Sequence, residues 1–180
     1  GIKDYTIFMP GSLDNAKNIK DATSYEDNTH SVVVIYNVVN PDASPKGTTV
    51  MTFTICYTED VWGDFTQREY VRKKQELFKK VMDNFEKDTG IIIHDCIEEI
   101  ELASPWTFAH FLNTPEGTVY GYRVDDWDTM LSRLMAIRKD QPIRGFKTCG
   151  AAGARGDGYN MTYTNGNDIG KIILEEMEGK

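Results

Sequence analysis

Five glycines stand close together near the C-terminal end of the sequence, in a segment that leads into a stretch with helical spacing. Glycine has no Cβ atom, so the backbone around it can approach a ligand closely. The first turn of a helix favours an anion because its N–H groups have no partners within the helix. The segment therefore predicts either a ligand-binding loop or a mobile connection. Its glycines are Gly145, Gly150, Gly153, Gly156 and Gly158.

The spacing of these glycines does not fit the common nucleotide-binding loops. The order Gly153-x-x-Gly156-x-Gly158 is the reverse of G-x-G-x-x-G, and too little chain follows for a β-α-β unit. A Walker A loop would need Gly-Lys-Ser/Thr at its end, which the segment lacks. The tripeptide from Arg155 to Asp157 matches the integrin-recognition sequence, and a match of three residues arises easily by chance.

The histidines and cysteines offer little support for metal or triad chemistry. His94 and Cys96 would share one face of a strand, which gives two ligands where a structural zinc site needs four. We expect a buried, hydrogen-bonded histidine beside a core cysteine and no metal site. The sequence has no Gly-x-Ser-x-Gly elbow. No catalytic acid or base can be named from the residues.

Alternation and capping signals predict the elements of the first half. Residues 4–9, 31–37 and 49–57 read as strands, and the last two should pair antiparallel across the turn at 40–47. Thr66 and Glu69 have the spacing of a capping box, and Gly90 is suited to end the helix that follows. One face of this helix is basic, which indicates a solvated surface or contact with a membrane.

The second half reads as a mixture of strands and helices. Alternation predicts a long strand over 91–102 and short strands over 118–122 and 146–149. Apolar residues at three- and four-residue spacing predict helices over 127–137 and from about residue 159 to the C-terminal end.

Length and composition are those of one ordinary globular domain. The 180 residues are 40% hydrophobic and 27% charged, and 20 basic against 28 acidic side chains give a net charge of −8. These values exclude disordered, collagenous and small disulfide-rich chains, and an acidic surface disfavours nucleic acid as a partner. Three scattered cysteines are typical of a reducing compartment, so we expect a cytoplasmic protein.

Three segments, taken in order, resemble the C-terminal portion of FAD-dependent oxidoreductases of the phytoene desaturase and carotenoid isomerase type. Residues 40–47 resemble the Asp-Pro…Ala-Pro-x-Gly turn of that family, and residues 104–121 are similar to its Thr-Pro…Gly…Tyr-Gly stretch. Residues 142–151 resemble its closing strand before the glycine-rich loop. The sequence departs from the family at 155–158 (RGDG for Pro-Gly-Gly-Gly), at 160–161 (NM for Pro-Gly) and at 165–166 (NG for Ser-Gly).

The resemblance implies FAD as cofactor and a long apolar, isoprenoid-like molecule as substrate. In this family the ADP part of FAD lies on an N-terminal Gly-x-Gly-x-x-Gly unit, which this sequence does not contain. We therefore expect a C-terminal fragment of a longer oxidoreductase that binds FAD weakly or not at all by itself, with the N-terminal region as its missing partner. The residues implied to approach the flavin, mainly through their backbone, are Gly150, Ala151, Gly156, Gly158 and Tyr159.

The fold expected from these patterns is α+β, a mainly antiparallel sheet with flanking helices and a C-terminal strand, glycine loop and helix from a split FAD-binding domain. Residues 1–140 would form the substrate-binding region and residues 141–180 the part that completes the FAD-binding domain. Exposed sheet edges would allow a homodimer, and peripheral contact with a membrane stays open. The alternative functions are a freestanding module that binds a small apolar ligand without redox activity, and a purely structural or oligomerisation domain.

Overall fold

The chain was analysed as a computed structural model that describes residues 2–57, 61–63, 65–121, 129–139 and 143–179. It divides into two compact units, Gly1–Leu102 and Ala103–Lys180. Each unit is considered by itself. The functional boundary predicted at residues 140 and 141 stays a prediction.

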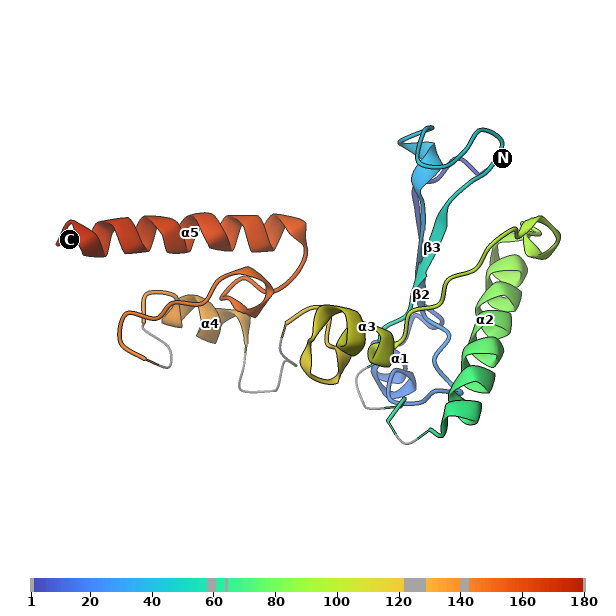
Figure 1. Cartoon of the computed structure of the whole chain (residues 1–180), viewed down its shortest axis with the longest axis horizontal. Coiled ribbons are helices and arrows are strands. Elements are labelled where there is room, and N and C mark those ends of the chain that lie inside the picture. The colour runs from blue at the N-terminus through green and yellow to red at the C-terminus, as the bar shows by residue number, and fades with distance from the viewer. Residues whose placement is uncertain (1, 58–60, 64, 122–128, 140–142, 180) are drawn as a thin grey trace. The chain divides into compact units, whose positions relative to one another are not determined.

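A three-stranded antiparallel sheet forms the centre of the first unit (Figure 1). Its strands follow the chain in the order β1 (Thr6–Met9), β2 (Ser31–Ile35) and β3 (Met51–Thr54). All three lie inside the ranges that alternation predicts. The antiparallel pairing of β2 with β3 is confirmed, and β1 pairs with the other edge of β2.

Alternation along β2 divides its side chains between the two faces of the sheet. Val33 pairs with Ile7 and Phe53, and its side chain is fully buried. Val32 pairs with Phe8 and Thr54 on the opposite face and is only half-buried. One face of the sheet is therefore covered, and the other is largely open.

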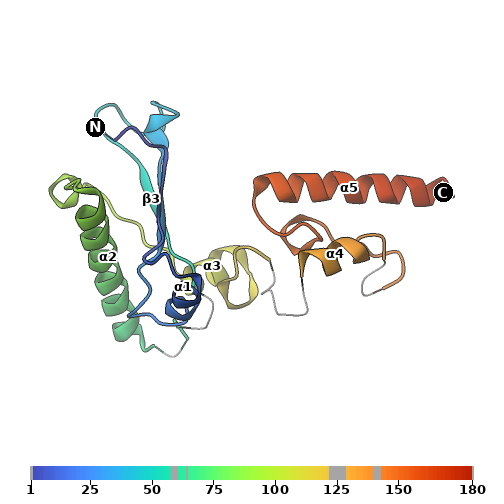
Figure 2. The ribbon, with the colours of Figure 1, turned by 180° about the vertical axis from the view of Figure 1, so that it is seen from behind.

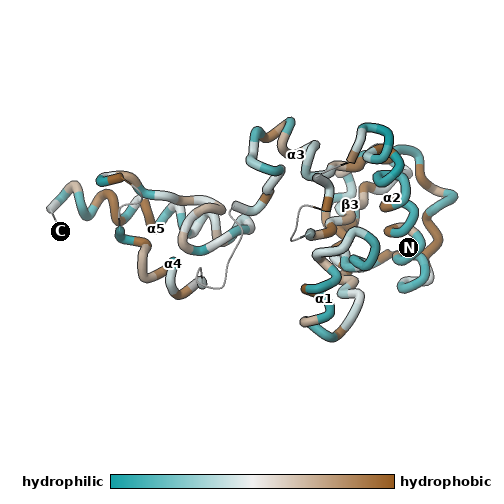
Figure 3. The backbone as a smooth tube through the Cα atoms, turned by 90° about the horizontal axis from the view of Figure 1, so that it is seen from below, coloured by the Kyte–Doolittle hydropathy of each residue, from teal (hydrophilic) through white to brown (hydrophobic). Residues whose placement is uncertain are grey.

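The long helix α2 (Gln67–Thr89) covers the buried face and lies beside the sheet in both views (Figures 1 and 2). Phe85 belongs to the same buried cluster as Val33 and meets Phe53 edge to face at 5.4 Å between ring centroids. Hydrophobic and hydrophilic residues alternate along the tube of α2, as an amphipathic helix requires (Figure 3).

The ends of α2 confirm the predicted signals. The Thr66 hydroxyl accepts a hydrogen bond from the Glu69 amide at 3.3 Å, and the Glu69 carboxylate accepts one from the Thr66 amide at 3.0 Å. Gly90 follows the helix with φ of 71°, a left-handed conformation that suits glycine.

A second buried cluster lies along the first half of α2 and is aromatic. Trp62 is only 2% exposed and meets Tyr25 at 5.5 Å between ring centroids. Tyr25 also donates its hydroxyl proton to the Lys73 carbonyl, and the Lys73 ammonium lies 4.2 Å from the centre of the Tyr25 ring. The short helices α1 (Asn15–Asp21) and η1 (Tyr36–Val38) connect the strands.

Residues 91–102 do not form the predicted strand. Their regular structure is the single turn η2 (His94–Cys96). The Glu86 carboxylate accepts hydrogen bonds from the amides of Ile93 at 2.6 Å and His94 at 2.8 Å, so these N–H groups are not available to a neighbouring strand. The alternation in this segment reflects packing of Ile91 and Ile93 against the core.

The second unit is helical over the residues that the structure describes. It contains α3 (Pro105–Leu112), η3 (Pro115–Gly117), α4 (Met130–Ala136), η4 (Gly150–Ala152) and α5 (Tyr159–Met177).

The helix predicted over 127–137 is present as α4, with residues 127 and 128 outside the described residues. The helix predicted from residue 159 is confirmed as α5. The strand predictions over 118–122 and 146–149 are wrong for the described residues, which form bends and irregular chain there. Both segments lack a strand to pair with among the described residues of the unit, and residue 122 itself is not described. The α+β class with an antiparallel sheet and flanking helices is confirmed.

The hydrogen bonds to Glu86 predict a pH-dependent contribution to stability. The amides of His94 and Ile93 and the His94 ring lower the pKa of the Glu86 carboxyl from 4.5 to about 2. A lowered pKa in the folded chain means that the stabilisation is complete above pH 4.5 and is lost as pH falls toward 2. Glu86→Gln should therefore lower the urea midpoint of unfolding at pH 7, and the difference from wild type should shrink below pH 4.

Asp88→Asn is the matched control, because Asp88 is an exposed carboxyl on the same helix for which the structure shows no side-chain hydrogen bond. A gap between Glu86→Gln and wild type that stays constant from pH 7 to pH 3 would contradict the assignment.

Candidate functional site

The glycine-rich segment forms an irregular loop that passes through η4 and ends at α5. Gly150, Gly156 and Gly158 have φ of 75°, 79° and 86°, the left-handed conformations that glycine tolerates. A Cβ atom at any of the three would have no described neighbour within 4 Å, so the backbone is open on that side. The loop thus presents bare backbone at three of the five residues predicted to contact the flavin.

The other two predicted residues lie in the same loop region. Ala151 is in the middle of η4 and is half-buried. A Cβ atom on Gly121 would come within 2.5 Å of the Ala151 carbonyl oxygen, so these two stretches of backbone are closely packed. Tyr159 is the first residue of α5, and its side chain is 84% exposed. All five predicted residues therefore lie in the segment from η4 to the start of α5, and their contact with a flavin stays a prediction.

The first turn of α5 carries the positive end of the helix dipole and has no acid of its own, and the exposed Asp157 lies directly before its N-cap Gly158. No side chain of the described residues caps Gly158, and residues 159–162 include no acid. The backbone N–H groups at this end can therefore donate hydrogen bonds to an anionic or strongly polar group.

Ion pairs tie α5 to the chain that precedes it. Arg155, in the loop, reaches Asp168 at 2.7 Å. Arg138 and Lys147 reach Glu175 and Glu176, each at 2.9 Å. The loop is thus held against the helix at several points, which favours a positioned loop over a mobile connection.

Asn165 is an additional site residue that sequence reasoning did not single out as functional. It is fully buried, yet neither its amide nitrogen nor its amide oxygen has a hydrogen-bond partner among the described residues. Its side chain fills the space beside Gly153, where a Cβ atom would come within 1.9 Å of the Asn165 oxygen. An unpaired buried amide costs about 1–3 kcal/mol of stability, so Asn165 is an unfavourable feature of the packing beside the glycine loop.

The arrangement suits recognition more than acid–base chemistry. The predicted flavin-contacting residues supply open backbone and one aromatic ring. A planar or anionic group could lie against the loop through these features. They do not identify a catalytic acid or base.

The prediction of a buried histidine beside a core cysteine is wrong. Both His94 and Cys96 are exposed, because the strand that would have buried them does not form. The Nδ1 atom of His94 lies 2.9 Å from Glu86, which makes it part of the connection after α2. Cys56, Cys96 and Cys149 are exposed and form no disulfide among the described residues. Among the described residues, no group of three His, Cys, Asp or Glu side chains could hold a metal ion.

The basic face of α2 is largely paired with acids. Lys73 reaches Glu26 at 2.8 Å, and Lys79 reaches Asp83 at 2.6 Å. These pairs fit a solvated helix face, and contact with a membrane stays a prediction. No helix within the described ranges has the length and apolar character to cross a membrane.

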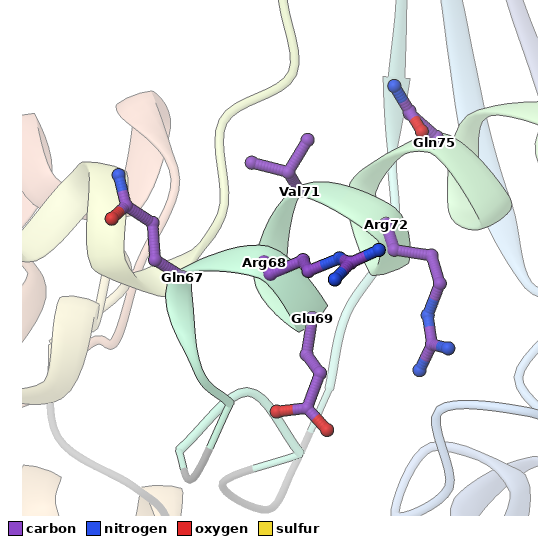
Figure 4. A pocket seen from close by; sticks show the side chains of 6 residues that line it. All are labelled: Gln67, Arg68, Glu69, Val71, Arg72 and Gln75. Atoms are coloured by element: carbon purple, nitrogen blue, oxygen red, sulfur yellow. The ribbon is translucent and has the colours of Figure 1, made fainter.

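A wide depression of about 700 Å³ lies on the first turns of α2, away from the glycine loop in the chain (Figure 4). Two of its polar side chains already have structural roles. Glu69 completes the capping box, and Arg72 lies 3.5 Å from Glu76. We assign it no chemistry. The lining residues are Gln67, Arg68, Glu69, Val71, Arg72 and Gln75.

Comparison with protein-family models, curated proteins and solved structures finds no match to this chain.

The contact between Gly153 and Asn165 predicts a coupled pair of substitutions. Gly153→Ala should lower the free energy of unfolding by about 1–3 kcal/mol, because the new methyl group overlaps the Asn165 amide. Asn165→Ala should be nearly neutral or stabilising, because it removes an unpaired buried amide. In the double variant, much of the Gly153→Ala loss should be recovered.

Urea unfolding of the four proteins in a double-mutant cycle measures this coupling. Additive effects would refute the contact.

Proposed function

We propose that this chain is the C-terminal portion of an FAD-dependent oxidoreductase that acts on a long apolar, isoprenoid-like substrate. The observation that carries the proposal is the glycine loop. Gly150, Gly156 and Gly158 hold left-handed backbone with open space where side chains would be, directly before a helix whose first turn is uncapped among the described residues.

The loop fits the cofactor on three structural grounds. Open backbone lets a flat ring system approach closely. The free amides at the start of α5 suit the polar edge or the phosphates of a nucleotide cofactor. Ion pairs such as Arg155 to Asp168 hold the loop in place, so little ordering entropy remains to be lost on binding.

The open face of the sheet supports an apolar substrate. Phe8 is 73% exposed on this face, and its neighbours across the strands are Val32 and Thr54. Thr6, Val34 and Thr52 form the next row. A surface of one aromatic ring, branched aliphatic groups and threonine methyls can bind a hydrocarbon chain by burial.

In this proposal the protein would position the flavin and the substrate, and the chemistry would belong to the cofactor. FAD, when bound, would supply the redox chemistry for desaturation of the substrate or for isomerisation of a double bond. The loop backbone of the second unit would orient the flavin, and the open sheet face of the first unit would offer an apolar surface for the substrate. The cytoplasm is the proposed location, supported by three exposed cysteines that form no disulfide among the described residues.

Flavin retention by the complete gene product tests the proposal. The protein expressed from the whole reading frame should keep bound FAD through desalting, with the absorbance of an oxidised flavin. The 180-residue chain alone should keep little or none. Gly158→Val should reduce retention at least about tenfold, because a β-branched side chain both strains the left-handed backbone and fills the open space.

Gly145→Val is the matched control, since Gly145 also has a positive φ of 78° and an open Cβ position but lies before the proposed contact residues. A complete protein that purifies without flavin in the presence of added FAD would overturn the proposal.

A second substitution distinguishes binding of the substrate from binding of the cofactor. Phe8→Lys on the open sheet face should weaken binding of an apolar substrate and leave flavin content unchanged. Steady-state kinetics of the complete enzyme should show the loss in kcat/KM. Equal loss of flavin would contradict the division of roles.

The open sheet face also favours one other function, a freestanding module that binds an apolar ligand without redox activity. The exposed Phe8 row carries this alternative. It would be supported if the native protein ends up with a bound lipid-like molecule and no flavin, as mass spectrometry of the denatured protein would reveal.

A further inference from the structure

Helix α5 has three distinct faces. One is buried against its own unit through Asn165, Ile169 and Ile172. A second is polar and contains Asn167 and Lys171. The third is apolar and exposed, and it has no partner among the described residues. It is formed by Tyr159, Tyr163, Gly166, Gly170, Ile173 and Met177, with Leu174 beside it.

The middle of the apolar face consists of two glycines one helical turn apart. Glycine inside a helix costs about 1 kcal/mol relative to alanine, and nothing described lies within 4 Å of a Cβ atom at Gly166 or Gly170. Their own unit therefore gives no steric reason for glycine at either position. Two adjacent glycines permit another backbone to approach closely, which larger side chains would prevent.

The apolar face is symmetric about residue 168. Its residues are separated by four, three, four, three and four positions. The pattern therefore reads the same in both directions along the helix. When two copies are placed antiparallel, Tyr159 lies opposite Met177, Tyr163 opposite Ile173 and Gly166 opposite Gly170. A surface that matches itself after a twofold rotation is what an isologous contact requires. Spacing of three and four is also that of helices that pack side by side.

We propose that a second copy of this chain packs antiparallel along this face of α5, with Gly166 of one copy crossing Gly170 of the other. Large side chains at both ends would then flank a close crossing at the glycines. The tyrosines Tyr159 and Tyr163, stacked at 6.3 Å between ring centroids, would pack on the aliphatic and thioether groups at the other end of the partner helix.

Charge favours the antiparallel arrangement. The N-terminal end of α5 has no acid in residues 159–162, and its C-terminal end has Glu175, Glu176 and Glu178 without a basic residue in the last described turn. The acidic C-terminal end is the reverse of what the dipole of a single helix prefers, and Arg138 and Lys147 already pair with Glu175 and Glu176 there. In an antiparallel pair, each acidic end also lies beside the positive end of the other helix, which adds to this pairing.

The exposed area is of the size that such a contact needs. Tyr159 and Tyr163 are 84% and 74% exposed, and two tyrosines at this exposure offer roughly 300 Å² of surface between them. The aliphatic end adds Met177 at 80% and Leu174 at 60%. A standard interface buries about 800 Å² per partner, so the face approaches that scale once the neighbouring polar rim is included.

Sedimentation of the 180-residue chain over a wide concentration range tests the proposal. Wild type should form dimers. Gly170→Leu and Ile173→Lys should each raise the dissociation constant about tenfold or more, because one blocks the close crossing and the other places a charge in the apolar contact. Lys171→Ala, on the polar face of the same helix, is the control and should dimerise as wild type does.

Substitution of the two glycines should change monomer stability and dimer affinity in opposite directions, which a misfolded variant would not do. Gly166→Ala with Gly170→Ala should raise the helix content and thermal stability of the monomer, because alanine is the better helix former. The same pair should weaken dimerisation. A variant that is better folded and yet less dimeric supports the crossing at the glycines, and one that dimerises as well as wild type overturns it.

Cysteine pairs test the register, in a chain whose three native cysteines are replaced by serine. A mixture of Tyr163→Cys and Ile173→Cys chains should form disulfide-linked heterodimers under mild oxidation, as the antiparallel register requires. Preferential linkage of Tyr163→Cys chains to one another would indicate a parallel pair and overturn the register.

A wild-type chain that stays monomeric at every concentration overturns the proposal, including the case in which another part of the same protein covers this face. Dimers that persist unchanged in Gly170→Leu and Ile173→Lys also overturn it and direct attention to the edges of the sheet. These outcomes are read from sedimentation, whereas the proposed function is read from flavin absorbance, so each can fail without the other.

Discussion

A helix in water is marginal unless one of its faces is buried, and this constraint organises both units of the protein. In the first unit, α2 gains that burial from one face of a three-stranded sheet, with Phe85 and Val33 fully buried where they meet. In the second, α5 gains it from the irregular chain before it, through Ile169, Ile172 and ion pairs such as Arg155 to Asp168. The glycine loop therefore has a fixed place because α5 needs a surface to pack on.

The parts of the fold that could be predicted from sequence are those with local causes. The capping box at Thr66 and Glu69, the left-handed Gly90 and the spacing of apolar residues along α2 all depend on neighbours within a few positions. Strand predictions depend on a partner elsewhere in the chain, and alternation alone does not supply one. Ile91 and Ile93 alternate because they reach into the core, while the neighbouring amides bind the Glu86 carboxylate.

The candidate site also has features that are visible in the local sequence and features that depend on how the chain folds. Glycines before a helix are visible in the sequence, and the structure places Gly150, Gly156 and Gly158 in left-handed backbone before α5. Asn165 could not be recognised as part of the site, because its burial depends on the loop folding back so that Gly153 lies against it. The pair Asn165-Gly166 at the place of a family Ser-Gly was the one local signal.

The two long helices differ in how many stabilising features they have at their ends and in their middle. Helix α2 has a capping box, an acid in its first turn, a base in its last turn and a glycine stop. Helix α5 has an uncapped start within the described chain, an acidic end, two glycines in its middle and a buried amide with no described partner. Each departure costs stability, and natural sequences retain such costs mainly at functional sites. A ligand at the loop would satisfy the uncapped start of α5, and a partner helix along the apolar face would offset the acidic end and the two glycines.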